Sequence, residues 1–102
     1  MPTFIYMLQL KSPYEKEACW TDETRATLGR HWNYLVDLHA KGVMKVVGRT
    51  EVPIENPENM GIAIFTAEDE AAAKLIMEND PCIKEGVMDG KLFPFNFALG
   101  GK

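Results

Sequence analysis

Cysteine and histidine are scarce in this chain, with two of each among 102 residues. Cys19 and Cys82 form no Cys-x-x-Cys motif and share no spacing with other metal ligands. This pattern predicts two free thiols in a reducing compartment. The alternative for Cys82 is a reactive thiol beside Asp80, which would need a lowered thiol pKa. We expect neither a metal nor an organic cofactor, because no set of ligands has the required spacing.

Positive charge is also in short supply. Eleven Lys and Arg stand against 15 Asp and Glu, so the net charge is -4 and the pI about 5.1. The basic residues form no stripe, which argues against a nucleic-acid partner. No apolar run approaches the roughly 18 residues that cross a bilayer, and the start Met1-Pro2-Thr3-Phe4 lacks the basic segment of a signal peptide. We therefore expect a cytoplasmic protein that binds neither nucleic acid nor a membrane.

Hydrophobic residues make up 46% of the sequence, enough for one domain over residues 1–102. Alternation from Phe4 to Leu10 predicts a strand with Phe4, Tyr6 and Leu8 on one face and Ile5 and Met7 on the other. The patterns that follow predict two helices and three strands: a helix over 22–41, strands over 43–52 and 60–65, a helix from the capping box 66–69 to just before Pro81, and, after a turn at 81–86, a strand over 91–99.

Each of these elements has a predicted apolar side. The first helix is expected to bury a stripe of Leu28, Trp32, Leu35 and His39, flanked by His31. The second strand is expected to place Met44, Val46, Gly48 and Val52 on one face. The last strand is expected to place Phe93, Phe95, Phe97 and Leu99 on one face.

The order strand-helix-strand-strand-helix-strand predicts an α+β, ferredoxin-like βαββαβ fold, with an antiparallel sheet and two helices on one face. The other face of the sheet would then be apolar and uncovered. Such a face signals a partner. We expect a homodimer in which two sheets face each other, as in a dimeric α/β barrel.

Proton-transfer chemistry is predicted at His31 and Asp80. His31 flanks the apolar stripe, and Asp80 opens the Asn-Asp-Pro turn after the second helix. In the predicted fold this turn can approach the first helix, so that the carboxylate would orient the imidazole for acid–base work. The alternative is structural, with His31 at the edge of the core and Asp80 as a turn residue. His39 is expected to cap the end of its helix.

Substrate contacts are predicted for three further residues. Arg49 would hold an anionic substrate by a bidentate contact. Tyr34, one helical step from His31, would donate a proton, and Tyr6 would line a pocket for a ring. The alternatives are a solvated strand end for Arg49 and packing for the two tyrosines.

Three segments of the chain resemble the YciI-like family of YCII-related domains, and the resemblance covers nearly its whole length. They are His31-Trp32-Asn33-Tyr34-Leu35 with Leu38 and Gly42, then Val46-Val47-Gly48, and finally Ala67-Glu68-Asp69-Glu70-Ala71-Ala72 leading to Asn79-Asp80-Pro81 and Gly86. The resemblance implies a dimeric ferredoxin-like α/β barrel and a His-Asp site at His31 and Asp80. One branch of the family eliminates HCl from a chlorinated hydroxyquinol. This chain differs from the family pattern at Gly48-Arg49, where Gly-Pro is common.

The first hypothesis is therefore a small lyase or isomerase that uses His31 and Asp80 on a small cyclic or aromatic compound. A second is a non-catalytic dimeric binding or accessory domain with a structural His-Asp pair. A third is a cofactor-free or haem-linked monooxygenase with the same barrel architecture.

Overall fold

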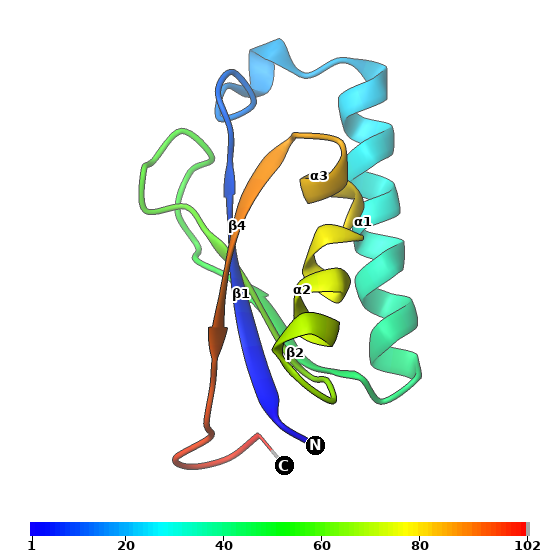
Figure 1. Ribbon diagram of the computed structural model, residues 1–102. Helices are drawn as coiled ribbons and strands as arrows, with labels where there is room; N and C mark the ends of the chain where they lie inside the picture. The colour runs from blue at the N-terminus through cyan, green and yellow to red at the C-terminus, as the bar shows by residue number, and fades with distance from the viewer. Residues whose placement is uncertain (102) are drawn as a thin grey trace.

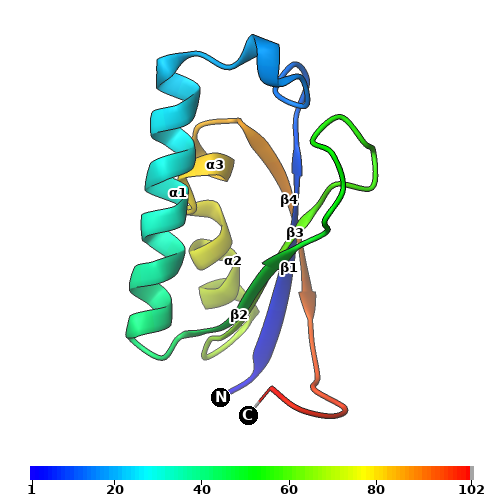
Figure 2. The same ribbon diagram turned by 180° about the vertical axis from the view of Figure 1, so that it is seen from behind.

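The computed structural model describes residues 1–101. It has a four-stranded antiparallel sheet in the order β2-β3-β1-β4, with all three α-helices on one face of it (Figures 1 and 2). In chain order the elements are β1 (Thr3–Leu10), the 3-10 helix η1 (Glu17–Cys19), α1 (Asp22–Ala40), β2 (Met44–Arg49), β3 (Gly61–Thr66), α2 (Glu70–Glu78), α3 (Pro81–Lys84) and β4 (Met88–Pro94). The predicted ferredoxin-like α+β fold is confirmed.

Helix α1 begins and ends where local chemistry requires. The Thr21 side chain accepts a hydrogen bond from the Thr24 amide, and the Thr24 side chain in turn accepts one from the Thr21 amide. This reciprocal cap satisfies two backbone amides that the first turn would otherwise leave unpaired. Gly42 follows the helix with φ +78°, a left-handed conformation that glycine adopts without steric cost.

The core lies between the sheet and the helices. Phe4, Tyr6 and Leu8 of β1 are buried on the helix side, as their alternation predicts. They meet Phe65 of β3 and Leu35 of α1 in one cluster. Burial of these side chains supplies the main stabilising free energy.

The buried stripe of α1 differs from the predicted one. Trp32 is 59% exposed and His39 is also exposed, so both assignments were wrong. Thr24, Thr27 and Leu35 are the buried residues of this helix. The stripe is rotated because two threonines, which hydropathy does not mark as apolar, occupy its first turns.

Strand β2 is shorter than predicted and contains a β-bulge. Met44 pairs with Phe65, but Val46 pairs with Ile64, so Lys45 is the extra residue. Beyond a bulge the alternation of faces is shifted by one residue. Val47 and Arg49 therefore share the helix side with Met44, and the predicted common face of Met44, Val46 and Gly48 is wrong.

Three other boundaries also differ from the prediction. Thr66 ends β3, and Asp69 instead caps α2 by accepting from the Ala72 amide. The predicted turn at 81–86 contains the short helix α3. Strand β4 ends at Pro94 rather than at residue 99. Its partner β1 begins at Thr3, whose carbonyl accepts a last hydrogen bond from the Phe95 amide at 2.9 Å.

The sheet face opposite the helices carries apolar side chains. Ile5, Met7 and Ile62 are partly exposed there, and Phe93 is 46% exposed. No helix within residues 1–101 combines the length and apolar character needed to cross a bilayer.

Glycine at position 90 sets how closely α3 approaches the sheet. A Cβ built there would lie 2.5 Å from Ile83 Cδ1 and 3.1 Å from the Met77 sulfur. By contrast, a Cβ at Gly29 on α1 meets nothing within 4 Å.

We therefore expect Gly90→Ala and Gly29→Ala to change stability in opposite directions. The atoms in the way at residue 90 are the ends of the Ile83 and Met77 side chains, which must leave their preferred rotamers, so the free energy of unfolding should fall by about 0.5–1.5 kcal/mol. Removing backbone freedom within an exposed helix should raise it by about 0.5–1 kcal/mol. Urea denaturation of both variants tests this, and a neutral Gly90→Ala would contradict the close contact.

Candidate active site

Asp80 stands between two helices, one residue beyond the C-cap of α2 and at the N-cap of α3. Its extended backbone (φ -61°, ψ 123°) ends α2, and its side chain accepts a hydrogen bond from the Cys82 amide at 3.0 Å. Pro81 occupies the first helical position, where its missing amide hydrogen costs nothing. The Asn-Asp-Pro turn thus delivers a carboxylate into the interior, where Asp80 has no exposed surface.

Three donors surround this buried carboxylate. Oδ1 lies 2.6 Å from His31 Nδ1 and 3.0 Å from the Cys82 amide nitrogen, and Oδ2 accepts from the Tyr6 hydroxyl at 2.8 Å. No buried side-chain nitrogen or oxygen within residues 1–101 lacks a hydrogen-bond partner. An ionised carboxylate is an acceptor only, so three donors are the surroundings that suit it.

The predicted encounter of His31 with Asp80 is present. It joins residues 49 apart in the sequence, and the His31 side chain keeps 14% of its surface exposed. With Nδ1 donating to the carboxylate, the tautomer leaves the lone pair on Nε2. His31 also lines a cavity, so this second nitrogen is the one available to a bound molecule.

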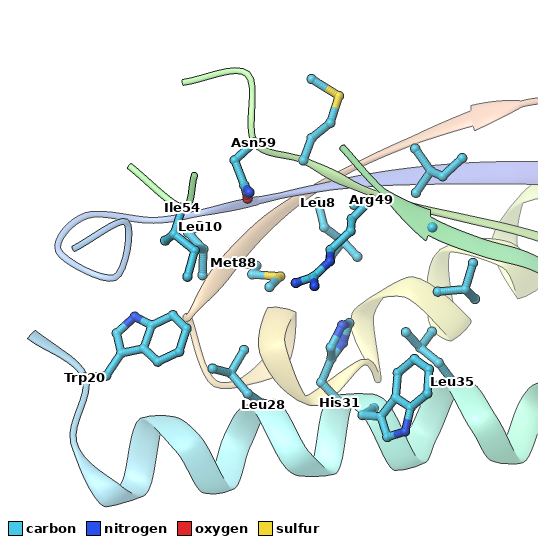
Figure 3. A pocket seen from close by; sticks show the side chains of 16 residues that line it. Leu8, Leu10, Trp20, Leu28, His31, Leu35, Arg49, Ile54, Asn59 and Met88 are labelled. Carbon is cyan, nitrogen blue, oxygen red and sulfur yellow. The ribbon is translucent and has the colours of Figure 1, made fainter. Parts of the chain in front are cut away.

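The cavity has a volume of about 620 Å³ and lies between α1 and the β2–β3 side of the sheet (Figure 3). Its wall is mainly apolar and includes Leu8, Leu10, Trp20, Leu28, Ile54 and Met88. The polar side chains on the wall are those of His31, Arg49 and Asn59. Such a hollow, apolar with a few convergent polar groups, is typical of a small-molecule site.

Arg49 reaches this cavity because of the bulge in β2. It pairs with Gly61 and therefore projects to the helix side of the sheet. Figure 3 shows its side chain extending from β2 toward His31. Uninterrupted alternation from the buried Met44 would have turned it to the opposite face.

The two tyrosines named from the sequence lie outside the cavity wall. Tyr6 is fully buried under Asp80, and Tyr34 donates from its hydroxyl to the Ile76 carbonyl of α2 at 2.7 Å. Burial and, secondly, the negative charge of Asp80 raise the pKa of Tyr6 far above its ordinary value, and the same two causes raise the pKa of Tyr34 to about 12. Both phenols therefore stay neutral donors at physiological pH.

Asn59 was not among the residues expected to line a site. Its side-chain nitrogen Nδ2 donates to the Val52 carbonyl at 3.1 Å, which links two parts of the β2–β3 loop. The side chain faces the cavity in Figure 3. Asparagine is common in turns, so its presence in a Pro/Asn-rich loop gave no sign that it lines a cavity.

The surroundings of Cys82 argue against a reactive thiol, since the residue has no exposed surface. Burial, and then the charge of Asp80, raise the pKa of its thiol to about 12, which opposes thiolate formation. His31, Asp80 and Cys82 do offer three ligand atoms within 4.8 Å of one another. However, nitrogen and oxygen ligands of a tetrahedral zinc ion lie about 3.3 Å apart, and the 2.6 Å between Nδ1 and Oδ1 is a hydrogen-bond distance.

A polar cluster fastens α3 to α1 near this pair. Glu85 Oε1 accepts from Arg30 at 2.6 Å and from the Thr27 hydroxyl at 2.9 Å. These two hydrogen bonds lower the pKa of Glu85 below its ordinary 4.5. Because α3 begins directly after Asp80, the cluster helps to hold the carboxylate against His31.

Replacement of Glu85 by Gln should therefore give a pH-dependent loss of stability. A carboxyl with a lowered folded-state pKa stabilises the fold above pH 4.5, and this contribution disappears as the pH falls through the folded-state value. The unfolding temperature of the wild type should be higher than that of Glu85→Gln at pH 7, and this difference should disappear in acid. Glu68→Gln, at an exposed position, is the control, and a gap independent of pH would contradict the role of the charge.

The comparisons with known proteins concern the family and the fold. The profile of the YCII-related domain matches residues 5–96. A solved structure of 5-chloro-2-hydroxyhydroquinone dehydrochlorinase from Burkholderia phenoliruptrix AC1100, in complex with 2,5-dihydroxybenzoquinone, is similar to this chain with a TM-score of 0.66. The two are 18% identical, over 92% of this chain and 93% of that one, so the likeness concerns the fold. No curated protein matches the sequence. Since the profile spans nearly all of the chain, the protein belongs to the family of YCII-related domains.

Proposed function

We propose that the protein is a small enzyme of lyase or isomerase type that moves protons on a cyclic or aromatic compound. The single observation that carries this proposal is the His31–Asp80 hydrogen bond at the wall of the apolar cavity. His31 is the acid–base group and acts through Nε2. Asp80 holds the imidazole in one tautomer and stabilises the imidazolium that forms.

Loss of HCl from a chlorinated trihydroxybenzene illustrates the chemistry. Nε2 first carries a proton from one ring hydroxyl to the carbon that bears chlorine, which gives the keto tautomer. It then takes the proton of a second hydroxyl. The electron pair of that bond forms a second carbonyl, the ring electrons shift, and chloride leaves with the pair of the C–Cl bond. The products are a hydroxyquinone and HCl, and one base serves both steps.

The environment supports this use of the pair. The apolar wall suits a flat ring, and the low polarity of the surroundings strengthens the attraction between the imidazolium and the carboxylate. The dehydrochlorinase with the similar fold is named for such a reaction and was crystallised with a ring compound. Both of its named compounds are rings small enough for a cavity of about 620 Å³.

A His31→Gln variant tests the catalytic role. The protein is incubated under nitrogen with 5-chloro-2-hydroxyhydroquinone, and chloride release and quinone absorbance are followed. We expect His31→Gln to lower the rate by about 10²- to 10⁴-fold, the usual worth of general acid–base help. His39→Gln, the same change on the exposed side of α1, should leave the rate unchanged.

Two outcomes would overturn this proposal. If the wild type released no chloride, this elimination would not be its reaction. If a folded His31→Gln protein worked as fast as the wild type, the His-Asp pair would be structural. The catalysis would then come from groups other than His31.

The proposal includes a homodimer, because apolar side chains such as Phe93 stay exposed on the sheet face opposite the helices, as is typical of an interaction surface. Sedimentation equilibrium should give twice the chain mass of 11.5 kDa. Phe93→Glu, on the open face, should shift the equilibrium to the monomer. Leu75→Glu, at a 60% exposed helix position, should not. A monomeric wild type would refute the dimer and leave the chemistry of His31 standing.

A cytoplasmic location stays a prediction. The two unpaired thiols, Cys19 and Cys82, are consistent with a reducing compartment.

A further inference from the structure

Arg49 stands across the cavity from His31. The guanidinium extends from β2, while the imidazole rises from α1 on the opposite wall (Figure 3). The residue paired with Arg49 in the sheet is Gly61, which has no side chain to pack against the stem of the arginine. A molecule in the cavity therefore meets a proton-transfer group on one side and a positive charge on the other.

This positive charge has no partner among residues 1–101. Within residues 1–101, Arg49 takes part in none of the salt bridges and none of the side-chain hydrogen bonds, although the protein carries an excess of acidic residues. No Asp or Glu is among the residues that line the cavity. Asp80 is hydrogen-bonded to His31 but is not part of the cavity wall. Arg49 is exposed and lines the cavity, so its guanidinium can present its donors to a molecule that enters.

We propose that Arg49 determines specificity by holding an anionic oxygen of the substrate, either a carboxylate or an enolate. This inference rests on the proposed function, since it assigns the substrate class of the same cavity. The planar fork of arginine donates two parallel hydrogen bonds to such a group, which fixes the ring in orientation as well as in place. The opposite edge of the ring then faces Nε2 of His31.

The same contact assists the reaction. When His31 takes a hydroxyl proton, negative charge develops on the substrate oxygens. A guanidinium that is already positioned stabilises this charge without having to reorganise. Arg49 thus acts on both the binding of the anion and the rate of the proton transfer.

Matched pairs of ligands separate charge from shape. Calorimetry should compare 2,5-dihydroxybenzoquinone with its dimethyl ether, and 2,5-dihydroxybenzoate with its methyl ester. The first pair tests an enolate oxygen, and the second tests a carboxylate. In the wild type we expect the anion of at least one pair to bind more tightly than its neutral counterpart.

Arg49→Met keeps an unbranched apolar stem and removes the guanidinium with its charge. It should weaken binding of the preferred anion by about 10- to 100-fold, as for the loss of a charged hydrogen bond, and change the neutral ligand little. Arg49→Lys should recover part of the loss, because it restores the charge without the fork. Arg25→Met is the control, since Arg25 pairs with Asp22 on the surface of α1.

The outcomes also separate this inference from the proposed function. Equal affinity of Arg49→Met and the wild type for the anions overturns the anchor, even if His31→Gln abolishes chloride release. Weaker anion binding by Arg49→Met supports the anchor, even if the wild type releases no chloride. Wild-type affinities that do not differ between an anion and its ester or ether, in both pairs, overturn the inference as well.

Discussion

The buried carboxylate of Asp80 is the constraint on which the candidate site depends. An isolated charge in the interior is costly, and several donors are needed to offset the loss of water. Here β1 supplies the Tyr6 hydroxyl, α1 supplies His31 Nδ1, and the start of α3 supplies the Cys82 amide. One side chain thereby joins the sheet to two helices. The geometry of the imidazole follows from the packing of the whole helical layer rather than from one flexible contact.

The two halves of the cavity are built by different means. The half that contains His31 depends on burial, because Asp80 is inaccessible and the His31 side chain is only 14% exposed. The half that contains Arg49 depends on a backbone irregularity, because Lys45 is the extra residue that shifts the facing of β2. Bulges often re-aim a side chain beside a functional site.

Much of the fold could be predicted from the sequence, since strand alternation and helix caps are local signals. The pairing of His31 with Asp80 was also predictable, because the order of the elements brings the Asn-Asp-Pro turn to the first helix. The bulge was not predictable in this way, since it depends on the register between β2 and β3. For the same reason Arg49 was assigned from its chemistry and not from its direction. The partner of Tyr6 was missed because a tyrosine in an apolar strand looks like ordinary core.

The carboxylate itself takes no part in the wall of the cavity, which has a consequence for how this family can diversify. The apolar lining comes from β1, β4, α1 and the β2–β3 loop, for example Leu10, Leu28, Ile54 and Met88. None of these four side chains supplies a hydrogen bond to Asp80. The shape of the hollow can therefore drift through exchanges of one aliphatic residue for another while the His31–Asp80 pair keeps its alignment, so that the lining and the pair can change independently of each other.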